Sequence, residues 1–152
     1  MNTYAKAYEI GLSKKPVNLN LVSEKFIGDK NENLNVIDND KFIGTSNPKI
    51  WGPHYWYNLH NSSLHYPINA SPIVKERIKN RIRAIPYEIS CRACQIHASA
   101  YIEQFSEKEL DDIVSGRDNL FKFYVDFHNS VNKRLGKPIW SVEEAIKFYN
   151  KN

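Results

Sequence analysis

Between residues 48 and 149, apolar side chains recur at steps of three and four residues, and the pattern is interrupted by proline, glycine and capping residues. This spacing places the apolar side chains on one face of an α-helix. Several such faces in one chain must be buried against one another. The sequence predicts helices over residues 48–65, 72–85, 91–105, 119–135 and 142–149.

The predicted helix boundaries carry residues with known terminal preferences. Asn47 and Ser71 each precede a proline, and an Asn or Ser N-cap followed by proline is a typical helix start. The stretch SVEE, residues 141–144, can form a capping box, and Gly136 is a strong stop signal. Further expected boundaries are N-caps at Ser90 and Asp118 and stops at Pro67 and Pro86. These signals predict an all-α fold, a four-helix bundle with a short fifth helix that closes one end.

The first part of the chain differs from the rest. Residues 1–47 are rich in Asn, Asp and Lys and contain only short apolar alternations such as VNLNLV, which suit weak strands better than helices. The 152-residue chain, with 41% hydrophobic residues, has the length of one domain. We therefore expect an N-terminal extension over residues 1–47, formed by weak strands or disordered, and a single domain over residues 48–152.

Charge and hydropathy argue against a membrane-spanning, a secreted and a nucleic-acid-binding protein. No apolar run reaches the roughly 18 residues of a membrane-spanning helix, and the first residues lack the apolar stretch of a secretory signal. The net charge is +4, and the densest basic run, VKERIKNRIR at 74–83, has no interleaved aromatic residues. That run is more typical of a solvated helix face than of a nucleic-acid-binding surface. We expect a cytoplasmic protein that binds neither membranes nor nucleic acids.

The only two cysteines, Cys91 and Cys94, form a C-x-x-C motif at the predicted start of the third helix. With Ser90 as the N-cap, free backbone N–H groups and the helix dipole would favour a thiolate at this position. A thiol with an ordinary pKa of about 8.5 is roughly 3% ionised at pH 7, whereas a pKa lowered by about 1.5 units makes it half ionised. The motif therefore indicates a redox-active dithiol.

Two alternatives for the motif remain open on the sequence alone. The cysteines would be a pair of buried small apolar residues, or they would form part of a zinc site with His97 and a fourth ligand from His60, His65 or His128. Haem attachment is excluded because Gln95, rather than His, follows the motif. A thioredoxin fold is not indicated, since no βαβ pattern surrounds the cysteines.

Two further stretches accompany the C-x-x-C motif. They are WGPHYWYNLH, residues 51–60, and HNSVNKRLGKP, residues 128–138. Together with CRAC between them, they resemble the Erv/ALR family of FAD-linked sulfhydryl oxidases over residues 51–149. The element H-N-x-V-N-x-x-L-G-K-P is particularly specific. The resemblance implies a four-helix bundle that holds FAD at one end, with the C-x-x-C motif at the flavin.

The resemblance also implies which side chains hold the cofactor. Flat aromatic and imidazole rings stack on adenine and isoalloxazine, and a lysine offsets the charge of the phosphates. The implied cofactor-binding residues are Gly52, Trp56, His60, Tyr66, His128, Asn129, Asn132, Lys137 and Tyr149, the last of which stands where the family commonly has a Trp. His97 lies on the face of Cys94, where a flavin contact and plain helix surface remain equally open. No metal is implied.

The resemblance implies Cys91 and Cys94 as the catalytic pair. A substrate thiolate would attack the sulfur of Cys91 in the disulfide, form a mixed disulfide and release Cys94 as a thiolate beside the flavin. The electrons would then pass to the flavin and on to O2, giving H2O2. Family members are generally dimers through their first two helices, so a homodimer is expected.

Departures from the family pattern indicate the kind of substrate. Val125 and Val142 stand where cysteines are common in the family, and the sequence has no second cysteine pair that could act as a shuttle. It is therefore similar to the minimal members encoded by large DNA viruses, which implies work in the host cytoplasm or the virion. The implied substrate is a dithiol protein, in particular a small thioredoxin-like redox partner. A non-enzymatic helical interaction module and a small zinc-stabilised interaction domain remain as alternatives from other classes.

Overall fold

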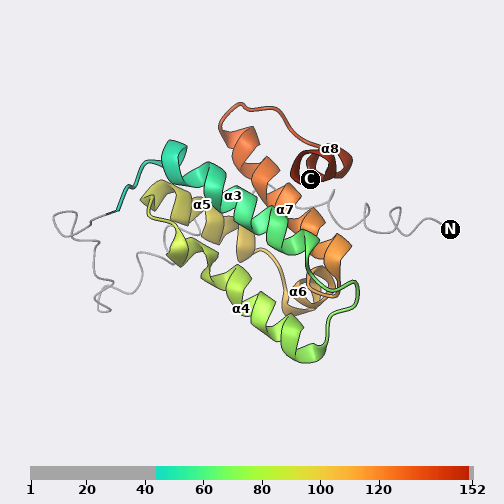
Figure 1. Ribbon diagram of the computed structural model, residues 1–152. Coiled ribbons are helices and arrows are strands. Elements are labelled where there is room, and N and C mark those ends of the chain that lie inside the picture. The colour runs from blue at the N-terminus through green and yellow to red at the C-terminus, as the bar shows by residue number, and fades with distance from the viewer. Residues whose placement is uncertain (1–43, 151–152) are drawn as a thin grey trace, which may run out of the picture.

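The computed structural model describes residues 44–150, and this part of the chain contains six α-helices and no strand. Four longer helices form a bundle, α6 links α5 to α7, and α8 packs beside α3 and α7 (Figure 1). None of these helices is both long and apolar enough to cross a membrane. The predicted all-α bundle is confirmed, whereas the weak strands expected before residue 44 lie outside the described residues. The helices are α3 Pro48–Leu64, α4 Pro72–Glu88, α5 Arg92–Ile102, α6 Glu107–Ile113, α7 Arg117–Arg134 and α8 Val142–Tyr149.

Several predicted helix ends are confirmed by their hydrogen bonds. The side chain of Asn47 accepts a hydrogen bond from the N–H of Lys49 at 3.0 Å and so caps α3. Ser141 and Glu144 satisfy each other's backbone N–H groups in a complete capping box at the start of α8. Gly136 follows α7 with a φ of 64°, which a residue without a Cβ adopts at little cost.

Other predicted boundaries are wrong by a few residues. α4 continues past Pro86 to Glu88. Proline in the last turn removes only one backbone N–H from the helix, and its fixed φ is compatible with a helical residue, so the helix does not have to end there. α7 begins after Gly116, and Asp118 lies in its first turn, where a carboxylate complements the helix dipole. The third predicted helix ends at Ile102, so Phe105 lies beyond it.

The apolar stripes do not predict helix α6. This short helix begins at a second capping box, in which Ser106 accepts from the N–H of Glu109 and Glu109 accepts from the N–H of Ser106. Only Leu110 and Ile113 of the helix are buried, so the apolar signal is weak. The stretch SEKE at 106–109 is the sequence signal that marks this helix.

Two basic side chains of the run in α4, Lys79 and Arg83, contact α6. Lys79, which is 8% exposed, places its Nζ 2.9 Å from Asp111, 3.0 Å from Glu76 and 3.6 Å from Glu107. Arg83 also pairs with Glu107. The run is therefore partly neutralised by acidic side chains within the fold, and the interpretation as a fully solvated face is wrong for Lys79.

The core places α3, α7 and α8 against one another. Leu59 of α3 and Tyr124 of α7 are fully buried in the main cluster, which extends to α4, α5 and α6. A smaller cluster joins α7 to α8 through Phe121, Val125 and Ala145. Each fully buried large side chain contributes about 1.5–3 kcal/mol, so these contacts fix the three helices as a platform for the side chains between them.

Candidate active site

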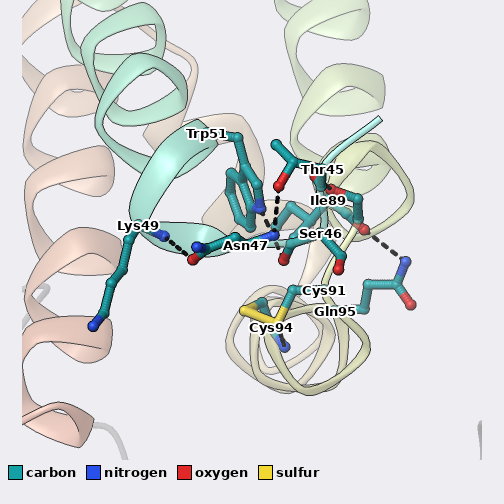
Figure 2. Close-up of a disulfide and its surroundings, with 10 residues drawn as sticks. Thr45, Ser46, Asn47, Lys49, Trp51, Ile89, Cys91, Cys94 and Gln95 are labelled. Atoms are coloured by element: carbon teal, nitrogen blue, oxygen red, sulfur yellow. Dashed lines mark hydrogen bonds between the residues drawn. A yellow bond between two sulfur atoms is a disulfide. The ribbon is translucent and has the colours of Figure 1, made fainter. Parts of the chain in front are cut away.

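Cys91 and Cys94 are joined by a disulfide at the N-terminus of α5 (Figure 2). Their Cα atoms are 5.1 Å apart, and both side chains are half-buried against the main core. Cys91 is the N-cap of α5, because its Sγ accepts a hydrogen bond from the N–H of Cys94 at 3.3 Å. The predicted cap at Ser90 is therefore wrong by one residue, and Cys91 precedes the helix rather than occupying its first position.

The loop that enters the disulfide is fixed by side-chain hydrogen bonds. The Nε2 of Gln95 donates to the carbonyl of Ile89 at 2.7 Å, and Ile89 itself is buried (Figure 2). On the other side, the hydroxyl of Ser90 donates to the carbonyl of Thr45 at 3.1 Å. The cysteine pair therefore lies beside the segment that leads into α3.

Four ring side chains from α3, α7 and α8 form a contiguous cluster. The ring of Trp56 stacks on His128 with centroids 4.1 Å apart and an interplanar angle of 6°. The ring of His60 stacks on Tyr149 at 4.3 Å, and its Nε2 lies 3.1 Å from Nδ1 of His128, so that one of these nitrogens donates to the other. The structure thus brings together four of the side chains that the resemblance implies at the cofactor.

His60, His97 and His128 are neutral at pH 7, because burial lowers the pKa of each. Burial, followed by the proximity of His128, lowers the pKa of His60 to about 3. Burial and the charge of Lys137 lower the pKa of His128 to about 4, and burial and Arg134 lower that of His97 to about 4. Neutral rings with two neighbouring cations suit a flat ligand that carries phosphate groups.

Three buried side-chain atoms of the described residues are left without a hydrogen-bond partner. Among the described residues, Nδ1 of His60 and Nε2 of His97 are buried without a hydrogen-bond partner, as is the hydroxyl of Tyr124. Gly52 is buried, yet a Cβ built on it would meet no atom within 4 Å. Buried polar atoms normally have partners, so the two imidazoles and the open space at Gly52 fit a heteroaromatic cofactor such as FAD.

Aromatic contacts lead from the cysteine helix to the ring cluster. Tyr101 of α5 stacks on Phe127 of α7 with centroids 4.9 Å apart. Phe127 in turn meets the ring of Trp56 edge-on at 5.2 Å. The disulfide helix and the ring cluster are therefore packed into one continuous aromatic region.

Comparison with known proteins identifies the family. The model of the Erv1/Alr family matches residues 53–151. The chain belongs to the Erv1/Alr family. The putative FAD-linked sulfhydryl oxidase 347L of Invertebrate iridescent virus 6 is 41% identical over 102 residues, 66% of this chain and 92% of that relative. The probable FAD-linked sulfhydryl oxidase R368 of Acanthamoeba polyphaga mimivirus is 32% identical over 104 residues, 68% of this chain and 71% of that relative. The crystal structure of the yeast Erv1 core has the same fold, with a TM-score of 0.62 at 22% identity over 70% of this chain and 86% of that one.

The H-N-x-V-N element, on which the family resemblance partly rests, holds the link between α7 and α8. The side chain of Asn129 donates to the carbonyl of Trp140 at 2.7 Å and accepts from its N–H at 3.0 Å. The carbonyl of Asn132 accepts from the N–H of Lys137 at 2.9 Å. The ring of Trp140, whose centroid lies 6.3 Å from that of His128, adjoins the ring cluster, and the sequence did not single it out. The sequence signal that could have pointed to Trp140 is its position directly before the SVEE capping box.

Tyr66 lies apart from the ring cluster. It is 5% exposed, and its hydroxyl donates to the carbonyl of Val114 at 2.9 Å within the main core. This bond ties the link after α3 to the end of α6. A cofactor contact of Tyr66 stays a prediction that would involve its ring rather than its hydroxyl.

The zinc alternative has little support in the geometry. Both sulfurs are bonded to each other, so neither is a free thiolate ligand in this form. Within residues 44–150, no group of three or more His, Cys, Asp or Glu side chains is arranged to hold a metal ion. The cysteine pair is therefore interpreted through its disulfide chemistry.

Proposed function

We propose that this chain is an FAD-linked sulfhydryl oxidase, which converts two thiols into a disulfide and passes the electrons through Cys91 and Cys94 to FAD and then to O2, giving H2O2. The observation that carries the proposal is a disulfide between the two cysteines of the chain, on a helix packed against Trp56 through aromatic contacts. Membership of the Erv1/Alr family and viral relatives named FAD-linked sulfhydryl oxidases support it.

The two cysteines have different roles in thiol–disulfide exchange. The first substrate thiolate attacks Sγ of Cys91; the new mixed disulfide forms as the bond to Cys94 breaks, and Cys94 leaves as a thiolate. The second substrate thiolate attacks the substrate sulfur of that mixed disulfide and displaces Cys91, which yields the substrate disulfide. Bound FAD supplies a two-electron acceptor that O2 can reoxidise. The Cys91–Cys94 bond closes again when the pair gives up two electrons and two protons.

The ring cluster is the proposed cofactor pocket. Trp56 and His128 supply one stacked pair, and His60 and Tyr149 supply the other. The ammonium of Lys137 is close enough to lower the pKa of His128, which suits a role beside the phosphates. Contacts of FAD with Gly52, His97, Asn129, Asn132 and Tyr66 belong to the same proposal.

Partner, assembly and compartment form the finer part of the proposal. Because the sequence offers no second cysteine pair, we expect Cys91 to react directly with a small thioredoxin-like dithiol protein. A homodimer through α3 and α4 is supported by apolar side chains left exposed there, at Ile50, Tyr57, Ile73 and Tyr87. The viral relatives support work in the host cytoplasm or the virion. In the cytoplasm a disulfide is more often catalytic than structural. The oxidase domain is proposed to span residues 48–152.

One purification tests the main proposal. The protein should carry a flavin absorbance spectrum, consume O2 in the presence of a dithiol, and produce H2O2. Cys91→Ser and Cys94→Ser should each abolish turnover, because either change removes one sulfur of the redox pair. A colourless protein that consumes no O2, before and after these substitutions, would instead favour a helical interaction module.

A further inference from the structure

Gln95, the residue after the C-x-x-C motif, bonds to both residues that flank Ser90 in the loop before α5. Its backbone N–H donates to the carbonyl of Cys91 at 2.9 Å, and its side-chain Nε2 donates to the carbonyl of Ile89 at 2.7 Å. Its Oε1 lies 3.4 Å from a guanidinium nitrogen of Arg92, which fixes which end of the amide faces the loop. Gln95 therefore joins the first turn of α5 to the loop that enters it.

The side-chain bond differs from the backbone bond in what it holds. The hydrogen bond from the backbone N–H of Gln95 is part of the helix and would form with any residue except proline at this position. The side-chain Nε2, in contrast, reaches outside the helix to a carbonyl of the loop. Ile89 is 6% exposed, so this carbonyl belongs to a residue already anchored in the core. The loop is thus pinned between the core and the helix (Figure 2).

This arrangement bears on how easily the disulfide closes. Once the disulfide is reduced, Cys94 stays on the helix, but the position of Cys91 depends on the loop before it. Closure within a pair is favoured when the two groups are held near each other, because less conformational freedom is lost. Pinning the loop limits the freedom of the dithiol more than that of the disulfide, which is already cross-linked. The bond from Gln95 should therefore stabilise the disulfide relative to the dithiol.

We propose that Gln95 is a positioning residue that sets the redox equilibrium of the Cys91–Cys94 pair by holding the loop before Cys91 through the Ile89 carbonyl. The inference rests on the proposed function in taking this pair as the one that oxidises substrate. In turnover, the same bond keeps Cys91 within reach of Cys94, so that the pair closes again after each substrate has left.

The equilibrium can be measured directly on the full chain with its cofactor, under argon, in buffers of graded glutathione ratio. Two glutathione thiols reduce the Cys91–Cys94 disulfide to the dithiol and form one glutathione disulfide. Acid quenching, alkylation and mass spectrometry then give the fraction of dithiol. Gln95→Met keeps the length of the side chain and removes its donor. The matched control is Gln104→Met, since Nε2 of Gln104 also donates to a backbone carbonyl, that of Tyr101 near the end of α5, at 2.8 Å.

We expect the disulfide of Gln95→Met to be less stable against glutathione by up to about fivefold, the full effect of one net hydrogen bond made in the disulfide and lost in the dithiol. Fivefold corresponds to about 20 mV for a two-electron couple. Gln104→Met should match the unmodified chain. Gln95→Lys, which restores an N–H donor, should return toward the unmodified value. Gln95→Glu, which has no donor at pH 7, should repeat the shift and serves if the Met variant does not fold.

The proposal is overturned if the donor-lacking variants match the unmodified chain, if Gln104→Met shifts as far as Gln95→Met, or if Gln95→Lys shifts like Gln95→Met. The flavin spectrum and O2 consumption of the same samples report separately on the proposed function. A chain without flavin or turnover would contradict that function while the glutathione equilibrium still decides the role of Gln95.

Discussion

The buried imidazole of His60 should make the folded chain lose stability as the pH falls from 7 to 5. His60 is 1% exposed, and burial, followed by His128, lowers its pKa to about 3. In the unfolded chain the same group has a pKa of about 6.5. Below pH 6.5 the unfolded state takes up a proton that the folded state does not. Stability that is fully present above pH 6.5 is therefore lost as the pH falls toward 3.

The size of the effect follows from the two pKa values. Each pH unit between them costs about 1.4 kcal/mol, and integration from pH 7 to pH 5 gives about 2 kcal/mol for His60 alone. His60→Phe removes the titrating group while keeping a ring beside Tyr149 and Phe121. Its free energy of unfolding should therefore fall by about 2 kcal/mol less than that of the unmodified chain over the same range.

Urea unfolding followed by tryptophan fluorescence at pH 7 and pH 5, with saturating FAD in every sample, measures this difference. If the substitution changes the affinity for FAD equally at both pH values, that change cancels from the difference between the two free energies of unfolding. His54→Phe, at an exposed position of the same helix, controls for replacing a histidine by phenylalanine. If His60→Phe loses as much stability between pH 7 and pH 5 as the unmodified chain, the folded imidazole titrates normally and the reasoning is refuted.

Three further predictions concern the redox pair, the proposed cofactor pocket and the contact between α7 and α8. Cys91→Ser should leave Cys94 as a thiolate beside the flavin and give a long-wavelength charge-transfer band in the absorbance spectrum, whereas Cys94→Ser should not; the reverse pattern would exchange the two roles. Trp56→Ala removes a ring stacked in the proposed pocket and should lower the flavin content of the purified protein; full occupancy would count against the pocket. Val125→Cys combined with Val142→Cys should form a disulfide that raises the free energy of unfolding by about 3 kcal/mol, because both valines belong to the small cluster between α7 and α8. Two freely alkylated thiols in that variant would show that the positions do not meet.

Helix ends were predictable where the residue at the boundary itself caps the helix or adopts the backbone conformation that ends it. Asn47 caps α3 and Gly136 ends α7 as expected, because the determinants lie within a few residues of the boundary. Helix α6 was missed because only two of its side chains are buried, and ion pairs to Lys79 and Arg83 on another helix add to its contacts. Such long-range pairs leave no periodic signal in the sequence.

The candidate site was likewise predicted in part from the sequence. The disulfide and the ring cluster involve residues that the motifs had named, but the motifs did not fix which atom caps α5. Cys91 takes that role in place of Ser90, since its own sulfur can accept the N–H of Cys94. Trp140 joined the site only through the folding of the α7–α8 link, where Asn129 binds its backbone.

The ammonium group of Lys79 faces three carboxylates, from Glu76 on its own helix and from Glu107 and Asp111 on α6. Because the four side chains interact, the effect of a substitution at one of these positions depends on the residues at the other three. Replacing Lys79 alone removes the cation from these acids, and replacing one acid by a base places two like charges side by side. Because the three acidic side chains are more than half exposed, each single change has only a small cost in stability, which the paired change recovers. Substitutions at these positions should therefore appear together among related sequences, as correlated pairs between the 76–79 turn of α4 and the 107–111 turn of α6.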